Sequence, residues 1–310
     1  MVDRRCGSRL GANELSKRKV ELMEIKKVAV IGAGIMGHGI AQVAASAGFE
    51  VCLGSRREST LEAGRSKICD SIERFVKKGK TSEAERDAIL SRLSFTTDFE
   101  KTADGADLVV ESVAEDLELK MDVFRKVSAW ASPGAILATN TSQFSVTEIA
   151  SAVSSPSRVI GMHWMNPPVL MKLIEVVRGL ETSEETLQKV LAFAAKAGKE
   201  TVVCKDSQGF ISTRALMALR AECYRIFEEG VATKEDIDKT LRLAFLHPMG
   251  QFEMADFSGL DLDIPAFEGL SRIYGERFLP PQTIRHLVKA GKLGRQNGKG
   301  WYNYGEGRSQ

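Results

Sequence analysis

A histidine and a glutamate twelve residues apart could together act as a general base. His163 closes an extended apolar run that begins at 158, and Glu175 lies within the next run, at 172–177. Asn-Pro-Pro at 166–168 must turn the chain between the runs, which would bring the imidazole and the carboxylate together. A carboxylate that holds one ring nitrogen fixes the tautomer and raises the basicity of the other nitrogen, as removal of a hydroxyl proton requires. A purely structural pair fits this spacing equally well.

A glycine-rich turn near the start of the chain is typical of a dinucleotide site. The apolar run 27–32 leads into Gly-x-Gly-x-x-Gly, and a small-residue helix at 40–47 follows. Gly32 allows the tight turn, Gly34 lets the backbone approach phosphate, and Gly37 lets the helix pack on the strand, while the helix N-terminus offers unpaired N–H groups to the anion. The residues expected to bind the cofactor here are Gly32, Gly34, Ile35, Met36 and Gly37. The glycine spacing alone also fits a plain βα turn.

The residue expected to contact the adenosine ribose is a serine. The second apolar run, 50–54, is followed by Ser55, Arg56 and Arg57, whereas an NAD site usually has Asp or Glu about 20 residues after the glycines. Because position 55 carries a serine instead of an acid, no negative charge there repels a 2′-phosphate. The guanidinium groups of the two arginines suit bidentate phosphate contacts. The sequence therefore favours NADP as cofactor, with NAD possible. Alternatively, the two arginines are solvated loop residues.

These candidates require strands that end close to one another. Strand-like apolar runs recur at 27–32, 50–54, 107–111, 135–139, 158–162 and 172–177, and a shorter one lies at 200–203. Helical stretches lie between most of them, including 58–78, 83–92 and 118–131. This alternation predicts an α/β fold with a mainly parallel, doubly wound sheet covered on both faces. Thr182-x-x-Glu185 predicts a capping box that opens a further helix.

The chain changes character beyond Phe210. Residues 211–229 are helix-periodic, Thr233 opens another helix, and no strand-like alternation returns before the aromatic end at 301–304. The apolar face of 211–229 consists of Leu216, Leu219, Cys223, Ile226 and Phe227. We therefore predict a basic tail at 1–22, a dinucleotide-binding domain at 23–206 and an all-helical domain at 207–310. The apolar face favours a homodimer through the helical domain; alternatively, it packs on the first domain.

Composition excludes several classes of partner. The 43 Lys and Arg and 41 Asp and Glu give a formal net charge of +2, which gives no reason to expect nucleic acid. No apolar stretch approaches the ~20 residues of a membrane helix.

The five cysteines are scattered without C-x-x-C spacing, and the four histidines form no pattern with them, so we expect reduced thiols in the cytoplasm and no metal. Acidic residues in the tail at 1–22 argue against a transit segment and favour an extension without a fold.

Several motifs in order resemble the L-3-hydroxyacyl-CoA dehydrogenase family. They are GAGIMGHGIAQVAA (32–45), ATNTS (138–142), GMHWMNPP (161–168), MKLIEVV (171–177), DSQGFI (206–211), GQFEMAD (250–256) and GKLGRQNGKGWY (291–302). The match runs from about residue 25 to 304, and its spacing is more specific than the glycine loop alone. The resemblance implies a Rossmann domain joined to a dimerising helical domain. It also implies reversible hydride transfer between nicotinamide C4 and C3 of a 3-hydroxyacyl or 3-oxoacyl thioester.

The resemblance implies catalytic roles for four residues. His163 matches the family's base, and Glu175 matches the carboxylate that orients it. Ser142 and Asn166 match residues that contact the reacting oxygen and the surroundings of the histidine, and Ser142 matches a substrate contact as well. Ser142 could instead be a helix N-cap, where serine is favoured.

The resemblance also implies cofactor and substrate contacts. Glu115 matches a carboxylate near the nicotinamide end, and Asn140 joins the cofactor-binding set. Ser71 and Lys78 fall where the family binds CoA. The lysine run at 77–80 would suit its phosphates, although such a run is as often simply solvated.

The chain departs from the family pattern at three positions. Ser55 replaces the acid, Gln208 replaces a proline, and Thr213 replaces an asparagine that contacts substrate. The shorter Thr213 puts the exact substrate in doubt, but not the hydride chemistry. The sequence favours an NAD(P)-dependent 3-hydroxyacyl-CoA dehydrogenase for short chains. The alternatives are a dehydrogenase of a non-CoA hydroxy acid and a non-catalytic nucleotide-binding protein; the presence of both His163 and Glu175 argues against the latter.

Overall fold

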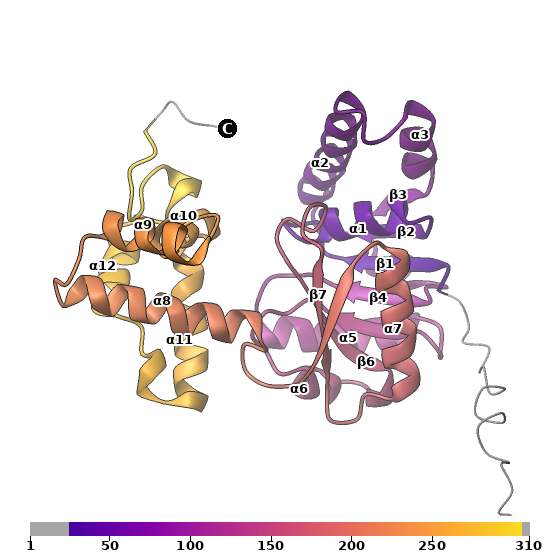
Figure 1. Cartoon of the computed structure of the whole chain (residues 1–310). Coiled ribbons are helices and arrows are strands. Elements are labelled where there is room, and N and C mark those ends of the chain that lie inside the picture. Colours follow the sequence, from indigo (N-terminus) through magenta and orange to yellow (C-terminus); the bar gives the residue numbers. More distant parts are fainter. Residues whose placement is uncertain (1–24, 306–310) are drawn as a thin grey trace, which may run out of the picture.

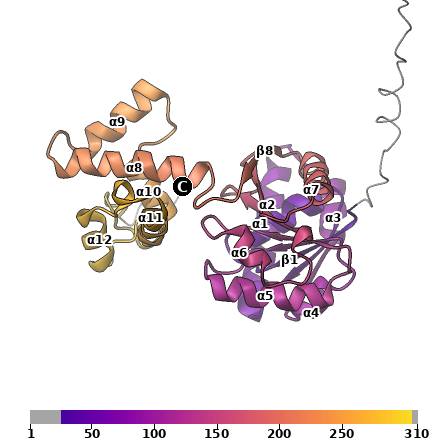
Figure 2. The same ribbon diagram turned by 90° about the horizontal axis from the view of Figure 1, so that it is seen from below.

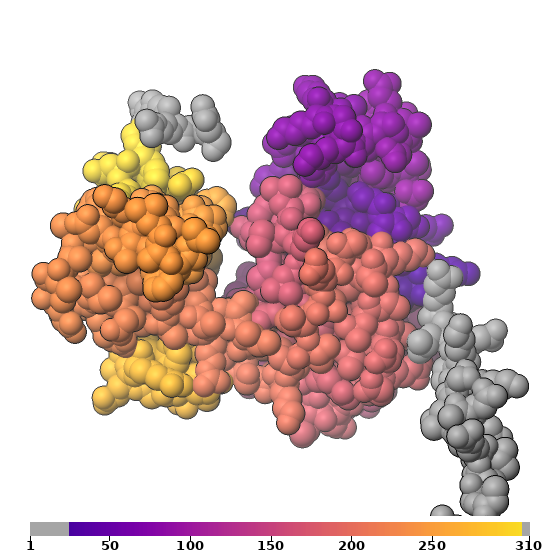
Figure 3. Space-filling view, viewed as in Figure 1, coloured from indigo at the N-terminus to yellow at the C-terminus, as the bar shows by residue number. Residues whose placement is uncertain are grey.

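The computed structural model describes residues 25–305 of the 310-residue chain. The basic tail predicted at 1–22 therefore lies outside the described residues. Figure 1 shows an α/β part, coloured indigo to salmon, next to a helical part coloured orange to yellow. In the space-filling view the two parts meet at the start of α8 (Ser212–Glu228), and a furrow separates them above that contact (Figure 3).

An eight-stranded sheet forms the centre of the α/β part. Its strands are β1 (Lys27–Ile31), β2 (Glu50–Gly54), β3 (Leu93–Thr96), β4 (Leu108–Glu111), β5 (Ile136–Thr139), β6 (Val159–Trp164), β7 (Leu173–Arg178) and β8 (Glu200–Lys205). The order is β3-β2-β1-β4-β5-β6-β7-β8; β1 to β6 are parallel, and β7 and β8 run the opposite way. The predicted mainly parallel sheet is confirmed. Because the strand order reverses between β1 and β4, a ligand crevice is expected at their carboxyl ends.

Helices cover both faces of this sheet, as predicted (Figure 2). They are α1 (Gly37–Ser46), α2 (Glu58–Lys77), α3 (Glu83–Ser91), α4 (Phe99–Ala103), α5 (Leu117–Trp130), α6 (Val146–Ala150), η1 (Pro156–Arg158) and α7 (Glu184–Lys196). Val28 and Val30 of β1 pack with α1, α2 and α7, whereas Ala29 and Ile31 pack with α5 and α6. A strand buried on both faces is mainly apolar, which explains the long apolar runs.

Two local features differ from the sequence prediction. The short strand β3 was not predicted; it pairs only with β2, and its residues are not fully buried, so its apolar pattern is weak. The capping box predicted at Thr182 is wrong. The Thr182 hydroxyl donates to the carbonyl of Val159 at 2.7 Å, and Ser183 caps α7 instead, accepting from the N–H of Thr186 at 3.1 Å.

The helical part has its own apolar core. Its helices are α8, α9 (Lys234–Phe245), α10 (Gln251–Ser258), α11 (Leu260–Tyr274), η2 (Glu276–Phe278), α12 (Gln282–Lys289) and η3 (Arg295–Asn297). Thr233 caps α9 as predicted, accepting from the N–H of Asp236 at 3.2 Å. Tyr224 and Trp301 are central to this core, and the apolar face predicted on α8 packs against it. The predicted alternative, that this face packs on the α/β part, is therefore wrong.

Several classes of feature are absent between residues 25 and 305. None of the helices in that range is long and apolar enough to span a membrane. No group of three or more His, Cys, Asp or Glu side chains there is arranged to hold a metal ion. The four cysteines in the range, Cys52, Cys69, Cys204 and Cys223, are all free thiols.

Candidate active site

The glycine loop lies between the ends of β1, β2 and β4. The N–H of Gly32 donates to the carbonyl of Gly54 at 2.8 Å. Gly32 has φ of 112°, and a Cβ there would lie 2.4 Å from the carbonyl oxygen of Ser112, so no other residue fits. A Cβ at Gly37 would lie 1.7 Å from the carbonyl oxygen of Gly32. In contrast, a Cβ at Gly34 would meet nothing within 4 Å, so this backbone borders open space at the start of α1.

Ser55 lies directly after β2, where the sequence predicted the ribose contact. Its N–H donates to the carbonyl of Thr96 at 3.2 Å, and the residue is only 6% exposed. Arg56 and Arg57 are exposed, and neither guanidinium makes a hydrogen bond or ion pair with another residue of the described range 25–305. Both cations are therefore available to an anionic ligand.

His163 and Glu175 face each other on the antiparallel strands β6 and β7. Nδ1 of His163 lies 2.7 Å from Oε2 of Glu175, and both side chains are buried. Burial alone would raise the pKa of Glu175, but hydrogen bonds from His163 and Ser212 outweigh it and lower the pKa. An ionised carboxylate only accepts hydrogen bonds, so Nδ1 carries the proton and Nε2 of the neutral ring is left as an acceptor.

The same carboxylate also holds the first turn of α8. Oε1 of Glu175 accepts from the N–H of Ser212 at 2.7 Å and of Ile211 at 3.2 Å. Oε2 accepts from the hydroxyl of Ser212 at 2.7 Å. Sequence reasoning missed Ser212, because nothing in the chain near residue 212 indicates a partner 37 positions earlier.

Ser142 and Glu115, predicted separately, lie in direct contact. Oε1 of Glu115 accepts from the N–H of Ser142 at 2.8 Å and from its hydroxyl at 3.2 Å. The hydroxyl of Thr141 donates to the same oxygen at 2.6 Å. Ser142 is not an N-cap, since Ser145 caps α6. The loop after β5 is therefore tied to the segment after β4, at the carboxyl ends of neighbouring strands.

A buried ion-pair network holds the carboxylate of Glu115 in place. Nζ of Lys120 lies 2.9 Å from Oε1 of Glu111 and 3.1 Å from Oε2 of Glu115. Burial alone would lower the pKa of Lys120 and raise that of Glu115, but the charges of the partners and the hydrogen bonds reverse both shifts. Lys120 and Glu115 therefore stay ionised. The hydroxyl of Thr139 donates to Oε2 of Glu111 at 2.7 Å and completes it.

The sequence analysis did not predict this network, although the position of Lys120 indicates it. Lys120 lies on the apolar stripe of α5 with Val123, Phe124 and Val127, all of which are buried. A lysine on such a stripe needs a buried partner. Glu111, the last residue of the fully buried strand β4, likewise indicates a buried charge that needs a partner of opposite charge.

The two predicted asparagines lie in different surroundings. Oδ1 of Asn140 accepts from the N–H of Trp164 at 2.9 Å, and its Nδ2 donates to the hydroxyl of Ser112 at 3.2 Å. Asn140 thus ties together the carboxyl ends of the central strands. Asn166 is exposed in the loop after β6. Thr213 lies in the first turn of α8, next to the Glu175 contact, and is half-buried.

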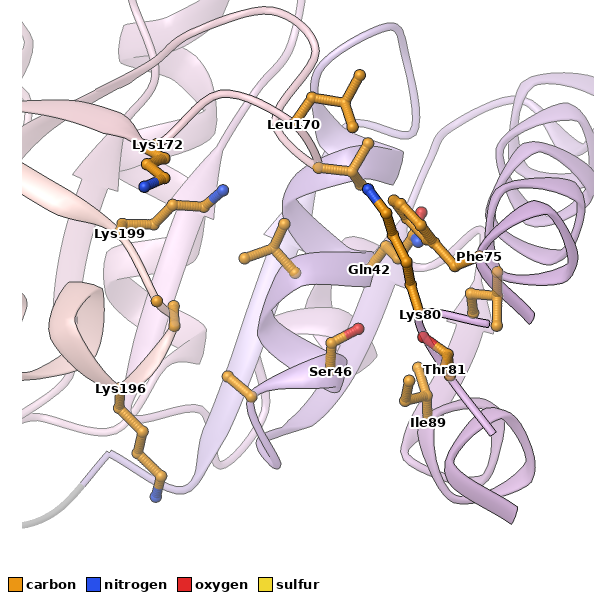
Figure 4. A pocket seen from close by; sticks show the side chains of 16 residues that line it. Gln42, Ser46, Phe75, Lys80, Thr81, Ile89, Leu170, Lys172, Lys196 and Lys199 are labelled. Carbon is orange, nitrogen blue, oxygen red and sulfur yellow. The ribbon is translucent and has the colours of Figure 1, made fainter. Parts of the chain in front are cut away.

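The predicted CoA contacts lie on α2 and directly after it. Ser71 is buried on its inner side, and Lys78 is exposed at its C-terminal end. A pocket of about 470 Å³ lies nearby, between α1, the end of α2, the loop 169–172 and the end of α7 (Figure 4). Lys80 enters it, whereas Lys199 is held at its edge by the carbonyls of Pro168 and Met171 at 2.6 and 2.8 Å. Neither the His–Glu pair nor the glycine loop lines this pocket.

Comparison with known proteins gives a consistent match. Residues 27–207 match the family model "3-hydroxyacyl-CoA dehydrogenase, NAD binding domain", and residues 209–304 match "3-hydroxyacyl-CoA dehydrogenase, C-terminal domain". A probable 3-hydroxybutyryl-CoA dehydrogenase of Bacillus subtilis is 43% identical over 285 residues, covering 92% of this chain and 99% of the relative. The 3-hydroxybutyryl-CoA dehydrogenase of Mycobacterium tuberculosis is 39% identical, covering 90% and 99%. The crystal structure of (S)-3-hydroxybutyryl-CoA dehydrogenase from Ralstonia eutropha has a TM-score of 0.87 and 34% identity, covering 91% and 100%.

Proposed function

Because the chain belongs to the 3-hydroxyacyl-CoA dehydrogenase family and is a nicotinamide-dependent oxidoreductase of that family, we propose its substrate range, its cofactor and the roles of its residues. The reaction transfers hydride reversibly between the nicotinamide and C3 of a 3-hydroxyacyl-CoA or 3-oxoacyl-CoA. We assign short acyl chains, because the relatives named above are 3-hydroxybutyryl-CoA dehydrogenases. The buried His163–Glu175 contact is the observation that carries the mechanism.

His163 acts as the general base in the oxidative direction. Its Nε2 takes the proton of the C3 hydroxyl, while Glu175 holds Nδ1–H and stabilises the positive charge that develops on the ring. In the reductive direction the protonated ring returns the proton to the C3 oxygen. Ser142 and Asn166 would contact that oxygen and the surroundings of the imidazole, and a bound nicotinamide would supply the hydride chemistry at its C4.

The residues of the glycine loop fit a dinucleotide. Gly34 borders open space, and Ile35 beside it is 69% exposed, so a pyrophosphate can approach the N–H groups at the start of α1. The cofactor-binding set in the loop is Gly32, Gly34, Ile35, Met36 and Gly37. Glu115 and Asn140 are assigned to the nicotinamide end, where both are held by hydrogen bonds at the carboxyl ends of central strands.

We assign NADP as the preferred cofactor. Ser55 places a hydroxyl where a carboxylate would repel the 2′-phosphate, and the guanidinium of Arg56 has no partner in the described range 25–305. An unpaired, exposed arginine can reach a phosphate without first breaking an ion pair.

CoA recognition is assigned to Ser71 on α2 and to Lys78 directly after it, with Thr213 at the acyl end. Thr213 has one hydroxyl and a short side chain where an amide is expected. A related dehydrogenase of a non-CoA hydroxy acid therefore remains the second candidate function.

We also propose a cytoplasmic location, a domain boundary after Asp206, and a homodimer formed by the helical domain.

A kinetic screen tests these assignments. Turnover is measured with NADPH and with NADH, against acetoacetyl-CoA and against free acetoacetate. Turnover of acetoacetyl-CoA with a preference for NADPH is expected. Turnover of free acetoacetate at equal kcat/KM would favour the non-CoA reading, and cofactor binding without any turnover would favour a non-catalytic nucleotide-binding protein.

A further inference from the structure

Ser212 shares an oxygen atom of Glu175 with His163. The Ser212 hydroxyl and Nδ1 of His163 each lie 2.7 Å from Oε2 of that carboxylate. Since an ionised carboxylate only accepts, the serine hydroxyl must donate. We propose that Ser212 is a positioning residue for the reaction, which fixes the Glu175 carboxylate and limits how strongly it stabilises the protonated imidazole.

The backbone places Ser212 at this point. Gly209 and Phe210 have φ of 73° and 49°, and they turn the chain after β8 so that α8 starts against the carboxylate. Phe210 is buried in the core of the α/β part, with its ring centroid 5.8 Å from that of His163. The first residue of α8 thus reaches a side chain in the sheet.

The effect of the hydroxyl follows from how the carboxylate charge is distributed. Four donors share the negative charge of Glu175: Nδ1–H of His163, the hydroxyl and N–H of Ser212, and the N–H of Ile211. Each hydrogen bond to an ionised group draws on that charge. Removing the hydroxyl concentrates charge on Oε2, strengthens its attraction for Nδ1–H and favours imidazolium. The protonated ring of His163 then loses its Nε2 proton at a higher pH.

Titratable side chains on β8, at the start of α8 and after β4 are neutral or engaged with other partners. On β8, burial and the charges of Glu175 and Asp206 raise the pKa of the Cys204 thiol to about 11, so it stays neutral. Asp206 is bound to the start of α6, Arg214 stacks on Tyr274 at 3.8 Å, and Glu115 pairs with Lys120. In the range 25–305 none of these four side chains hydrogen-bonds to Ser212, so its substitution acts through Glu175.

The test compares Ser212→Ala, Ser212→Thr and Thr233→Ala. Ser212→Thr keeps the hydroxyl, and Thr233→Ala removes a hydroxyl from the start of α9, where it accepts from the N–H of Asp236 and touches no catalytic residue. The inference rests on the proposed role of His163, so the first readout does not need turnover. It is the NMR titration of the His163 ring without ligands, identified by its absence in His163→Gln. The second readout is the pH profile of kcat/KM for oxidation of 3-hydroxybutyryl-CoA.

In Ser212→Ala the titration midpoint and the acidic limb of the oxidation profile are expected to rise by about 0.5–1 pH unit. Ser212→Thr and Thr233→Ala are expected to titrate as the unmutated protein does. An unchanged midpoint in Ser212→Ala, or an equal rise in Thr233→Ala, would overturn the proposal. If the midpoint rises in Ser212→Ala but His163→Gln keeps full activity, the influence of Ser212 is supported and the proposed base is wrong.

Discussion

Nδ1 of His163 and Oε2 of Glu175 lie 2.7 Å apart because their residues are paired directly across β6 and β7. In this register both side chains point to the same face of the sheet. A slip of one residue in either strand would turn one of them to the opposite face. The geometry of the pair is therefore set by the backbone of the sheet.

Removal of the base should abolish most of the activity. General acid–base assistance is typically worth ~10²–10⁴-fold, so His163→Ala should lower kcat by about that factor. Cofactor affinity, measured by fluorescence titration, should stay nearly unchanged, because the ring is not part of the glycine loop. His286→Ala, at an exposed position in the last turn of α12, is the matched control. Retention of more than half of kcat in His163→Ala would remove the residue from the mechanism.

Neutralising the partner should shift the pH dependence as well as the rate. The lowered pKa of Glu175 keeps this group ionised at neutral pH. In Glu175→Gln the amide no longer stabilises imidazolium, so the ring loses its proton at a lower pH, and the acidic limb of the oxidation profile should move down while kcat falls. A pH profile of kcat/KM checks this. A lower rate with an unmoved limb would reduce Glu175 to a structural role.

Cofactor preference should respond to two residues after β2. A charge-assisted hydrogen bond contributes on the order of 1.5–3 kcal/mol, or about one to two decades in preference. Ser55→Asp combined with Arg56→Gln should therefore move the kcat/KM ratio towards NADH by at least about tenfold. Arg57→Gln alone serves as the comparison. Strong preference for NADH in the unmutated protein would show that both arginines are ordinary surface charge.

The buried lysine should be important for stability. Lys120 is 1% exposed between two carboxylates, and loss of one partner of a buried ion pair typically costs about 3–5 kcal/mol. Lys120→Met should lower the free energy of unfolding in urea by about that amount, and adding Glu111→Gln should restore part of it. Lys126→Met, which breaks an exposed pair with Asp122 on the same helix, should change it by less than ~1 kcal/mol. Equal losses in the two lysine variants would contradict the importance of burial.

The proposed homodimer should depend on the end of α9. The face of α8 that suggested it is used by the core of the helical domain, but Leu243, Phe245 and Leu246 are 72, 64 and 86% exposed. Exposed apolar side chains gathered in this way commonly mark an interface. Phe245→Asp should therefore give a monomer in sedimentation equilibrium at micromolar concentration, while the unmutated chain sediments as a dimer. A monomeric unmutated chain would defeat the proposal.

Features that depend on residues close in sequence were predictable. The order of apolar run, glycines and helix predicted β1, the loop and α1, because each glycine satisfies a local steric demand. The long apolar runs predicted six of the eight strands in nearly the same bounds, because strands buried on both faces are mainly apolar. A seventh, shorter run matched the start of β8. The edge strand β3 escaped prediction, since partial burial leaves no such pattern.

Features that depend on partners distant in sequence were decided by the tertiary structure. The sequence by itself determined the fold class, the glycine loop and the identities of His163 and Glu175. Only the packed sheet decided that Ser212 joins that pair, that Lys120 is held between two carboxylates, and that Thr182 bonds to Val159 instead of capping α7. The physical reason is that a hydrogen-bonding side chain takes the nearest suitable partner in space, and strand order and helix placement decide which partner is nearest.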